Sequence, residues 1–324
     1  MKSRKALVEI RAILNKIQNS SEDFSKSKLK LIKNGHNRSI YLLKAKSGKK
    51  YIVKKGNDAK DLGSINLNDV RAQSFLRQSG CNFVPEIIYW DKESDLYIES
   101  YVGDKDIPFK SLKDKDLEVF AKQLAIVHSF SADQYVKFCQ NNKFDIPKIT
   151  TPVEDLKTFG FDRYNIAKET CKDEKVIKWL SQRLLKSLEI TKNPETVQLA
   201  PHFCWGDIGN NIRTDKSGKI YFIDWEFSKI GQESELAYIK IHSKLKPKQF
   251  KKLVTLYVEY RNAEITTDAL RTAIINSEKV TRTNDVVWAA MKWGQTKTRI
   301  LANKYKNLTY KRISLAEKLD SHRK

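Results

Sequence analysis

The most informative segment of the chain is residues 203–226, FCWGDIGNNIRTDKSGKIYFIDWE. Its first half places Asp207 shortly before two asparagines, and its second half is an apolar run that ends in Asp224. The polar, glycine-containing segment 214–218 between the halves is typical of a turn that joins two β-strands. We therefore predict a short hairpin that brings Asp207, an asparagine and Asp224 together at one end.

Two carboxylates and an amide oxygen are ligands that hard divalent cations such as Mg²⁺ prefer. The same set suits phosphoryl transfer, in which one aspartate accepts a hydroxyl proton while an asparagine and a second aspartate hold the metal on the nucleotide phosphates. Taken alone, a D-x-x-x-N pattern is more often part of an ordinary surface hairpin. Its pairing with an apolar strand that ends in aspartate favours the catalytic interpretation.

Length and composition indicate a folded globular protein. The chain has 324 residues, of which 40% are hydrophobic, which is enough for a sizeable core and for two domains or lobes. No apolar run approaches the length of a membrane span, and the first residues lack the apolar core of a signal peptide. The four cysteines and five histidines are scattered without metal-ligand spacing, so no zinc site is predicted. We therefore predict a soluble, cytoplasmic protein.

The formal net charge of +22 raises the question of a polyanionic partner. Residues 244–324 alone contain 19 basic and 7 acidic side chains. The lysines are not interleaved with aromatic residues in one stripe, and the chain has no nucleic-acid-binding motif. We favour an ordinary lysine-rich surface and keep RNA or another polyanion as an alternative partner.

The chain changes character near Gly103. Before it, short apolar runs alternate with polar turns and predict strands, with one helix in front and one between them. After it, the apolar spacing is mostly helical. We therefore predict two lobes, with residues 1–102 as a sheet lobe that has a leading helix and residues 103–324 as a larger helical lobe. The elements predicted for the first lobe are a helix over 5–17, strands over 29–32, 40–45 and 51–54, a helix over 67–78, and strands over 84–90 and 96–102.

This order of elements around the hairpin resembles the protein-kinase-like fold, and more closely the aminoglycoside phosphotransferase and choline kinase family. The resemblance implies an α+β, two-lobed fold with an N-terminal antiparallel sheet lobe and a larger, mostly helical C-terminal lobe. Its specific parts are WGDIGNNI and FIDWEFSKIG, and its weaker parts are YIVK at 51–54, VP at 84–85, LYIESYVG at 96–103 and QLAIVHS at 123–129.

The resemblance implies roles for the residues of the hairpin. Asp207 would be the base that orients and deprotonates the acceptor hydroxyl. Asp224 would bind the Mg²⁺ that bridges the nucleotide phosphates, and Asn211 would hold the second metal ion. Trp225 and Glu226 would face the cleft near the acceptor.

The same resemblance assigns the nucleotide to the first lobe. Lys54 would contact the α- and β-phosphates of ATP, supported by an acid on the following helix. Asp69 is the nearest candidate, although the family usually has the longer glutamate there. The turn between the first two strands would fold over the phosphates, and backbone groups of residues 99–101 would hold the adenine. The residues so predicted to bind the nucleotide are Gly35, Asn37, Ser39, Lys54, Asp69, Glu99 and Tyr101.

The sequence also departs from the family. Trp205 stands where the family usually has histidine, and an indole N–H could replace one hydrogen bond of that histidine. Asn211 follows Asp207 by four residues instead of the usual five, so Asn210 stays open as the metal ligand. Glu235 stands before Leu-Ala, where the family often has aspartate.

The sequence as a whole predicts an ATP-dependent phosphotransferase that moves the γ-phosphate to a hydroxyl of a small molecule. Two alternatives stay open. The first is a kinase of a protein or RNA on the same fold, suggested by the basic second lobe. The second is a nucleotide-binding module without turnover, suggested by the short metal loop and the replaced histidine. The basic second lobe also leans against cationic acceptors such as choline or an aminoglycoside.

Overall fold

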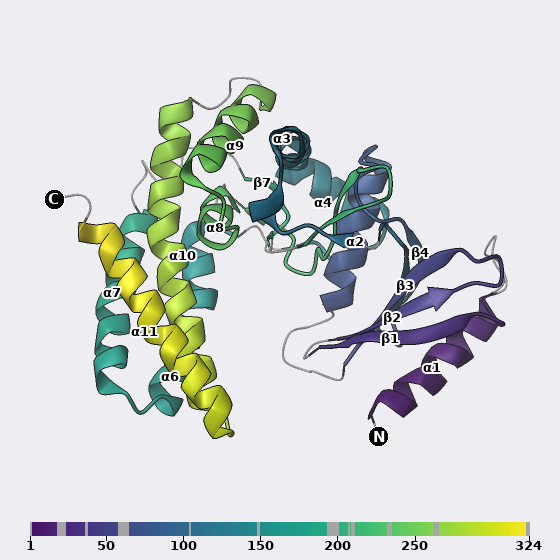
Figure 1. Ribbon diagram of the computed structural model, residues 1–324, viewed down its shortest axis with the longest axis horizontal. Coiled ribbons are helices and arrows are strands. Elements are labelled where there is room, and N and C mark those ends of the chain that lie inside the picture. The colour runs from purple at the N-terminus through teal and green to yellow at the C-terminus, as the bar shows by residue number, and fades with distance from the viewer. Residues whose placement is uncertain are drawn as a thin grey trace. The chain divides into compact units, whose positions relative to one another are not determined.

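The computed structural model describes most of the chain, and the described residues cluster into two compact units that interleave along the sequence (Figure 1). The predicted hairpin clusters with the N-terminal sheet in unit 1, whereas the lobe boundary after residue 102 stays a prediction. Unit 1 comprises Met1–Leu112, Gln134–Ile146 and Trp205–Ser228, and unit 2 comprises Lys113–Asp133, Pro147–Cys204 and Lys229–Lys324. The described residues are 2–17, 24–35, 38–57, 65–103, 105–147, 150–192, 201–206, 208, 211–231, 235–261 and 266–321.

Unit 1 is built on a five-stranded sheet with the strand order β1-β2-β3-β5-β4. Every neighbouring pair in this sheet is antiparallel, as predicted for the N-terminal part of the chain. The elements of unit 1 are α1 (Lys2–Lys16), β1 (Lys28–Asn34), β2 (Arg38–Lys44), β3 (Lys50–Gly56), α2 (Ile65–Gln78), β4 (Ile87–Asp91), β5 (Leu96–Ser100), β6 (Lys105–Asp106), the 3₁₀ turn η1 (Phe109–Ser111), most of α4 (Ala132–Asn141), β8 (Ile212–Thr214) and β9 (Ile220–Phe222).

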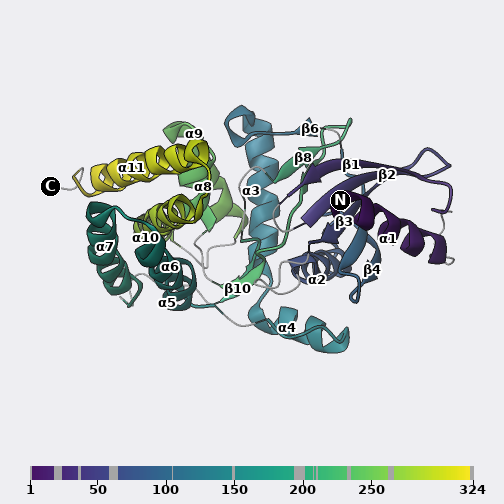
Figure 2. The same ribbon diagram turned by 90° about the horizontal axis from the view of Figure 1, so that it is seen from below.

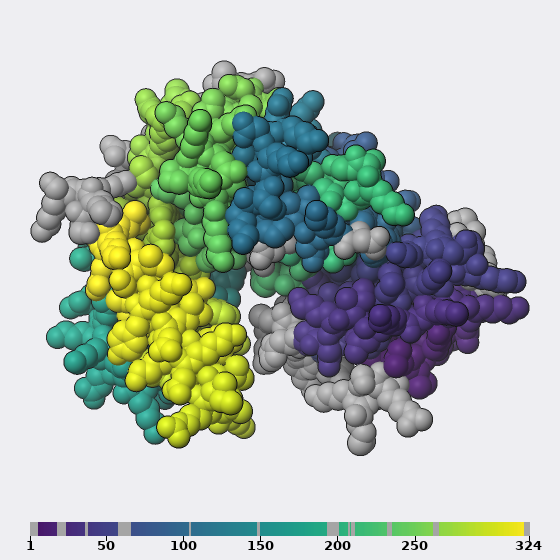
Figure 3. Space-filling view, viewed as in Figure 1, coloured from purple at the N-terminus to yellow at the C-terminus, as the bar shows by residue number. Residues whose placement is uncertain are grey.

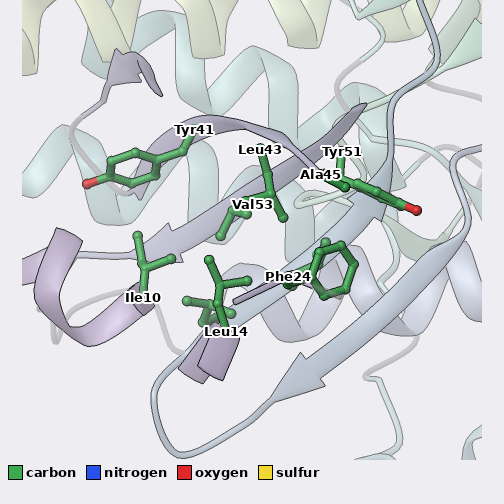
Figure 4. Packing of buried hydrophobic residues seen from close by; sticks show 10 residues of the cluster. Ile10, Leu14, Phe24, Tyr41, Leu43, Ala45, Tyr51 and Val53 are labelled. Atoms are coloured by element: carbon green, nitrogen blue, oxygen red, sulfur yellow. The ribbon is translucent and has the colours of Figure 1, made fainter. Parts of the chain in front are cut away.

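The two faces of this sheet have different surroundings because side chains alternate along a strand. Tyr41 and Leu43 of β2 and Val53 of β3 point to one face. There they pack against Ile10 and Leu14 of α1 in a buried apolar cluster (Figure 4). Helix α1 therefore belongs to the core of unit 1, and the opposite face of the sheet is left for charged side chains.

The predicted hairpin is confirmed by the pairing of β8 with β9. The carboxylate of Asp215 accepts hydrogen bonds from the backbone N–H groups of Ser217 at 2.9 Å and Lys219 at 3.1 Å. Gly218 closes the turn with a φ of +85°, a conformation that glycine adopts without steric cost. Local turn chemistry therefore sets the register of the two strands that lead to Asp224.

Unit 2 is mostly helical. Its longest helix, α10, has 29 residues, and α6, α7 and α11 lie alongside it (Figure 1, Figure 2). Helix α11, yellow in Figure 3, lies at the surface of this unit. None of the helices in the described part of the chain combines the length and the hydropathy needed to span a membrane. The elements of unit 2 are α3 (Asp114–Ser129), α5 (Pro152–Asp155), the π-helix η2 (Leu156–Asp162), α6 (Arg163–Thr170), α7 (Glu174–Lys192), β7 (His202–Cys204), β10 (Lys229–Gly231), α8 (Glu235–His242), α9 (Pro247–Tyr260), α10 (Thr267–Gln295) and α11 (Arg299–Ser321).

The substitution Ile10→Ala tests the contribution of α1 to the core of unit 1. Ile10 is completely buried, so we expect the loss of its side chain to lower the free energy of unfolding by about 2–5 kcal/mol. Val8 on the same helix is 67% exposed, and Val8→Ala should change that free energy by no more than about 0.5 kcal/mol. Urea unfolding followed by circular dichroism measures both. Equal effects of the two substitutions would show that α1 does not pack on the sheet.

Candidate active site

A buried cluster of charged side chains lies on the face of the sheet opposite α1. The strand register pairs Ile40 with Lys54 and Lys54 with Tyr97, so these residues share one face. By the same alternation, Arg38 of β2 and Glu99 of β5 point to that face as well. Helix α2 contacts β3, β4 and β5 and adds its own polar side chains to the cluster.

Lys54 is a buried cation held by two carboxylates. Its Nζ lies 3.2 Å from an oxygen of Glu99 and 3.5 Å from an oxygen of Asp69. It also lies 5.2 Å from the centre of the Tyr97 ring, within the range of a cation–π contact. A buried ammonium requires such partners, because burial without them carries a large desolvation cost. The predicted pairing of Lys54 with Asp69 is present, and Glu99 is an additional partner.

Asp69 is the most highly connected side chain of the cluster. Its carboxylate accepts a hydrogen bond from the Tyr97 hydroxyl at 2.7 Å and another from the backbone N–H of Trp225 at 2.6 Å. It also forms an ion pair with Arg38. Burial on its own would raise the pKa of Asp69, but the charges of Lys54 and Arg38 outweigh it and hold that pKa below its ordinary value. Asp69 is therefore ionised at neutral pH although it is completely buried.

Asp224, two residues after the end of β9 in the predicted metal loop, has an unusual backbone conformation. Asp224 has a φ of +67°, a left-handed conformation that is uncommon outside glycine but tolerated by aspartate. The indole N–H of Trp205 donates to the carbonyls of Ile223 at 3.1 Å and Asp224 at 3.3 Å. From the other side, Asp69 accepts the N–H of Trp225. Trp205 therefore anchors this loop through its indole N–H.

The segment around Trp205 is closely packed. Its indole stacks on Phe222 with 4.4 Å between ring centres and on Trp225 with 5.1 Å. Gly206 has a φ of +94°, and a Cβ there would lie 2.0 Å from the carbonyl oxygen of Phe227, so only glycine fits. Trp225 is completely buried in this stack. Its side chain therefore has no exposed surface for an acceptor, in contrast to the role that the sequence analysis gives it.

Arg38 joins the two halves of the cluster. One terminal nitrogen of its guanidinium pairs with Asp69, and the other pairs with Asp224 and, at 3.2 Å, with Glu226. Burial would lower the pKa of Arg38, but the neighbouring anions, Asp69 foremost, raise it above its ordinary value. The sequence does not single out this arginine. Its position two residues before Ile40, the partner of Lys54, is the signal that places it on the charged face.

The predicted phosphate-binding turn is only partly described. The N–H of Gly35 donates to the carbonyl of Arg38 at 2.9 Å and closes the turn. The Ser39 hydroxyl lies 2.9 Å from the side-chain oxygen of Asn34 and 3.1 Å from that of Asn57, and its one proton can be donated to either. By strand alternation Ser39 points to the face opposite Lys54, so the structure does not bring its hydroxyl into the charged cluster.

The remaining predicted residues lie at the edges of the cluster. The carbonyl of Asn211 accepts the N–H of Ile223 at 3.0 Å, which places Asn211 across the hairpin from the start of the Asp224 loop. Tyr101 follows β5, and its ring lies 5.0 Å from Nζ of Lys50. The predicted residues Asn37, Asp207 and Asn210 lie outside the described residues.

The cluster has the chemistry of a site for a hard cation. The carboxylates of Asp224 and Glu226 and the amide of Asn211 offer only oxygen donors to a metal, the kind that Mg²⁺ prefers. The first two already attract a cationic group, because the Arg38 guanidinium contacts both. Asp224 and Asn211, the predicted metal ligands, therefore have the donor type that Mg²⁺ prefers, and Glu226, predicted to face the acceptor, offers a further carboxylate.

A second polar cluster lies in unit 2. His128 of α3 contacts the hydroxyl of Tyr257 through Nδ1 at 2.8 Å and the carboxylate of Glu235 through Nε2. His202 and Cys204 lie beside it, and the possible ligand atoms of the two histidines and the cysteine lie within 4.8 Å of one another. These residues are scattered in the sequence, so the fold alone brings them together. Both ring nitrogens of His128 contact protein groups, so in this structure the cluster is a buried hydrogen-bonded core.

The architecture is shared with solved structures of kinases. The ethanolamine kinase of Plasmodium vivax matches with a TM-score of 0.67 and 14% identity over 93% of this chain and 85% of that one. A choline/ethanolamine kinase family protein from Mesorhizobium loti matches with a TM-score of 0.67 and 13% identity over 97% and 94% of the two chains. An aminoglycoside 2′-phosphotransferase, described as a GDP complex, matches with a TM-score of 0.61 and 14% identity over 98% and 97%. No protein-family model and no curated protein matches the sequence. At these identities the likeness establishes the fold, and the predicted fold class is confirmed.

The substitution Asp69→Ala tests whether its carboxylate holds the cluster together. It leaves the buried cations Arg38 and Lys54 without their shared partner, so we expect the free energy of unfolding to fall by about 3–5 kcal/mol. Asp106→Ala is the matched control, because Asp106 is 64% exposed and pairs with Arg213 at the surface. It should cost no more than about 1 kcal/mol. Denaturant unfolding measures both variants. If Asp69→Ala lowers the free energy of unfolding as little as the control does, the Asp69 carboxylate does not hold the cluster together.

The pKa of Asp69 also predicts how stability depends on pH. Because this pKa is lower in the folded chain than in the unfolded one, ionised Asp69 stabilises the fold fully above the unfolded value of about 3.9. That stabilisation is lost as the pH falls through the folded value. The difference in unfolding free energy between the wild type and Asp69→Asn should stay constant above about pH 5 and shrink below about pH 4. A difference that grows on acidification would mean that folding raises this pKa.

Proposed function

We propose that this chain is an ATP-dependent phosphotransferase that moves the γ-phosphate to a hydroxyl group of a small molecule. The observation that supports this most directly is that one carboxylate, Asp69, contacts both the buried Lys54 and the backbone of the Asp224 loop. Phosphoryl transfer relies on a cation and a metal held in fixed positions around the nucleotide phosphates. The fold shared with kinases and phosphotransferases supports the same conclusion.

In this proposal the nucleotide lies on the charged face of the sheet. Lys54 binds the α- and β-phosphates, and Glu99 and Asp69 hold its ammonium in place. The half-buried side chains of Ile40 and Leu42 offer an apolar surface for the adenine on the same face. Backbone groups at the end of β5, from Glu99 to Tyr101, supply its polar contacts.

The hairpin supplies the remaining groups. Asp224 and Asn211, or Asn210 in place of the latter, would hold Mg²⁺. When bound, the metal would neutralise the charge that develops on the transferred phosphoryl group. We assign Asp207 as the base from its place in the sequence, directly after the closely packed Trp205 and Gly206.

The acceptor is proposed to be a neutral or anionic compound with a hydroxyl group. Two deeply buried acidic side chains of unit 2, Glu235 and Glu278, are both paired with basic groups. Glu278 contacts Lys240 and Arg282, and Glu235 contacts His128. Because these carboxylates already contact basic side chains of the protein, they do not favour the binding of a cationic acceptor such as choline.

The substitution Asp207→Asn tests the proposed chemistry. With Mg²⁺, ATP or GTP, and pooled hydroxyl compounds, we expect phosphoryl transfer to fall by about 10²–10⁴-fold, because general base catalysis is lost. Nucleotide binding, measured by calorimetry, should be retained. Asp215→Asn in the adjacent turn is the control and should leave turnover intact. Full turnover by Asp207→Asn would remove this residue from the mechanism.

One observation favours the alternative of a nucleotide-binding module without turnover. The guanidinium of Arg38 already contacts Asp224 and Glu226, where the metal is proposed to bind. The assay above separates the two functions, because the module would bind the magnesium nucleotide and transfer phosphate to no acceptor. Nothing in the described residues favours a kinase of RNA.

A further inference from the structure

We propose that Arg38 competes with a divalent metal ion for the carboxylates of Asp224 and Glu226, and that the nucleotide phosphates become the alternative partner of its guanidinium. This inference rests on the proposed function, because it concerns the same metal and nucleotide. It gives Arg38, which lies outside the predicted site, the role of a phosphate ligand. It also explains how a metal site and a buried arginine can share the same oxygens.

The contacts of the guanidinium divide into a fixed one and an exchangeable one. The partner of the first terminal nitrogen, Asp69, has no exposed side-chain surface. The partners of the second, Asp224 and Glu226, have side chains that are 28% and 14% exposed. Solutes can therefore reach the second pair of carboxylates while the Asp69 contact stays within the core. A metal ion that binds these carboxylates would compete with the guanidinium for their charge.

The charges of the cluster determine the direction of the effect. Among the described residues of the cluster, the ion pairs join four carboxylates, those of Asp69, Glu99, Asp224 and Glu226, to the two cations Lys54 and Arg38. Loss of the guanidinium makes the cluster more negative, which strengthens its attraction for a divalent cation. The same loss repels the phosphates of a nucleotide. Metal affinity and nucleotide affinity should therefore change in opposite directions.

The position of Arg38 suits a phosphate ligand. Its carbonyl accepts the N–H of Gly35, so Arg38 lies at the end of the predicted phosphate-binding turn. It points to the same face of the sheet as Lys54, on the neighbouring strand. A guanidinium binds two oxygens of a phosphate at once through its fork of N–H groups. On release from Asp224, the second nitrogen of Arg38 can thus turn to a phosphate oxygen while the first keeps its bond to Asp69.

The test compares Arg38→Met with Arg213→Met in the full-length protein. Arg213 pairs with the exposed Asp106, so its loss removes one arginine and one ion pair away from the cluster. Binding of Mn²⁺ alone is measured by electron paramagnetic resonance, and binding of a fluorescent ATP analogue by fluorescence titration. For Arg38→Met we expect Mn²⁺ to bind about tenfold more tightly than to the wild type and the analogue about tenfold more weakly. Arg213→Met should match the wild type in both.

Two further variants, Arg38→Gln and Arg38→Lys, separate the effect of the charge from that of the shape of the side chain. Arg38→Gln retains a donor for Asp69 and removes the charge, so it replaces Arg38→Met if that variant does not fold, with the same expectation. Arg38→Lys retains the charge without the fork and should restore the Mn²⁺ affinity of the wild type. Unchanged Mn²⁺ affinity in the charge-removing variant would overturn the competition. If the wild type binds no nucleotide, the proposed function and the phosphate role fail, whereas the Mn²⁺ comparison still decides the competition.

Discussion

The buried carboxylate of Asp69 is the group on which the charged half of unit 1 depends. It contacts Lys54 of β3, Arg38 of β2, the hydroxyl of Tyr97 of β5, and the backbone after Asp224. A carboxylate without exposed surface is tolerated only when its oxygens are fully bonded and its charge is balanced. Burial of this charge therefore requires that helix α2, which carries Asp69, the three strands and the hairpin loop are all in place around it.

That requirement links stability to the proposed chemistry. The bond from Trp225 to Asp69 and the bonds from the Trp205 indole hold the left-handed backbone at Asp224 from two sides. Strained backbone of this kind persists where the surrounding structure over-determines it, and it is concentrated at functional sites. The Trp205 indole is thus one of the two anchors of the loop that carries Asp224.

The cluster also shows how one group can have two roles. Arg38 neutralises carboxylates that would otherwise repel one another across the sheet and the hairpin. Its charge and fork geometry suit a phosphate equally well. Unit 2 contains a comparable arrangement, in which the buried carboxylate of Glu278 contacts Lys240 and Arg282. Pairing of buried charges is thus a general device in this chain, and the pairs nearest the surface are the ones available to ligands.

The family resemblance suggested the pairing of Lys54 with Asp69, whereas the residues themselves predicted the strands of the sheet and the hairpin. These follow from alternation, turn residues and spacing, which act between residues close together in the chain. Only the tertiary structure decided that Arg38 reaches Asp224, that Glu99 is a second partner of Lys54, and that Trp225 is buried. Arg38 and Asp224 are far apart in the sequence, and their contact depends on which strands are neighbours, in which register, and where the hairpin docks. No local pattern encodes that docking, because it results from the burial of many side chains at once.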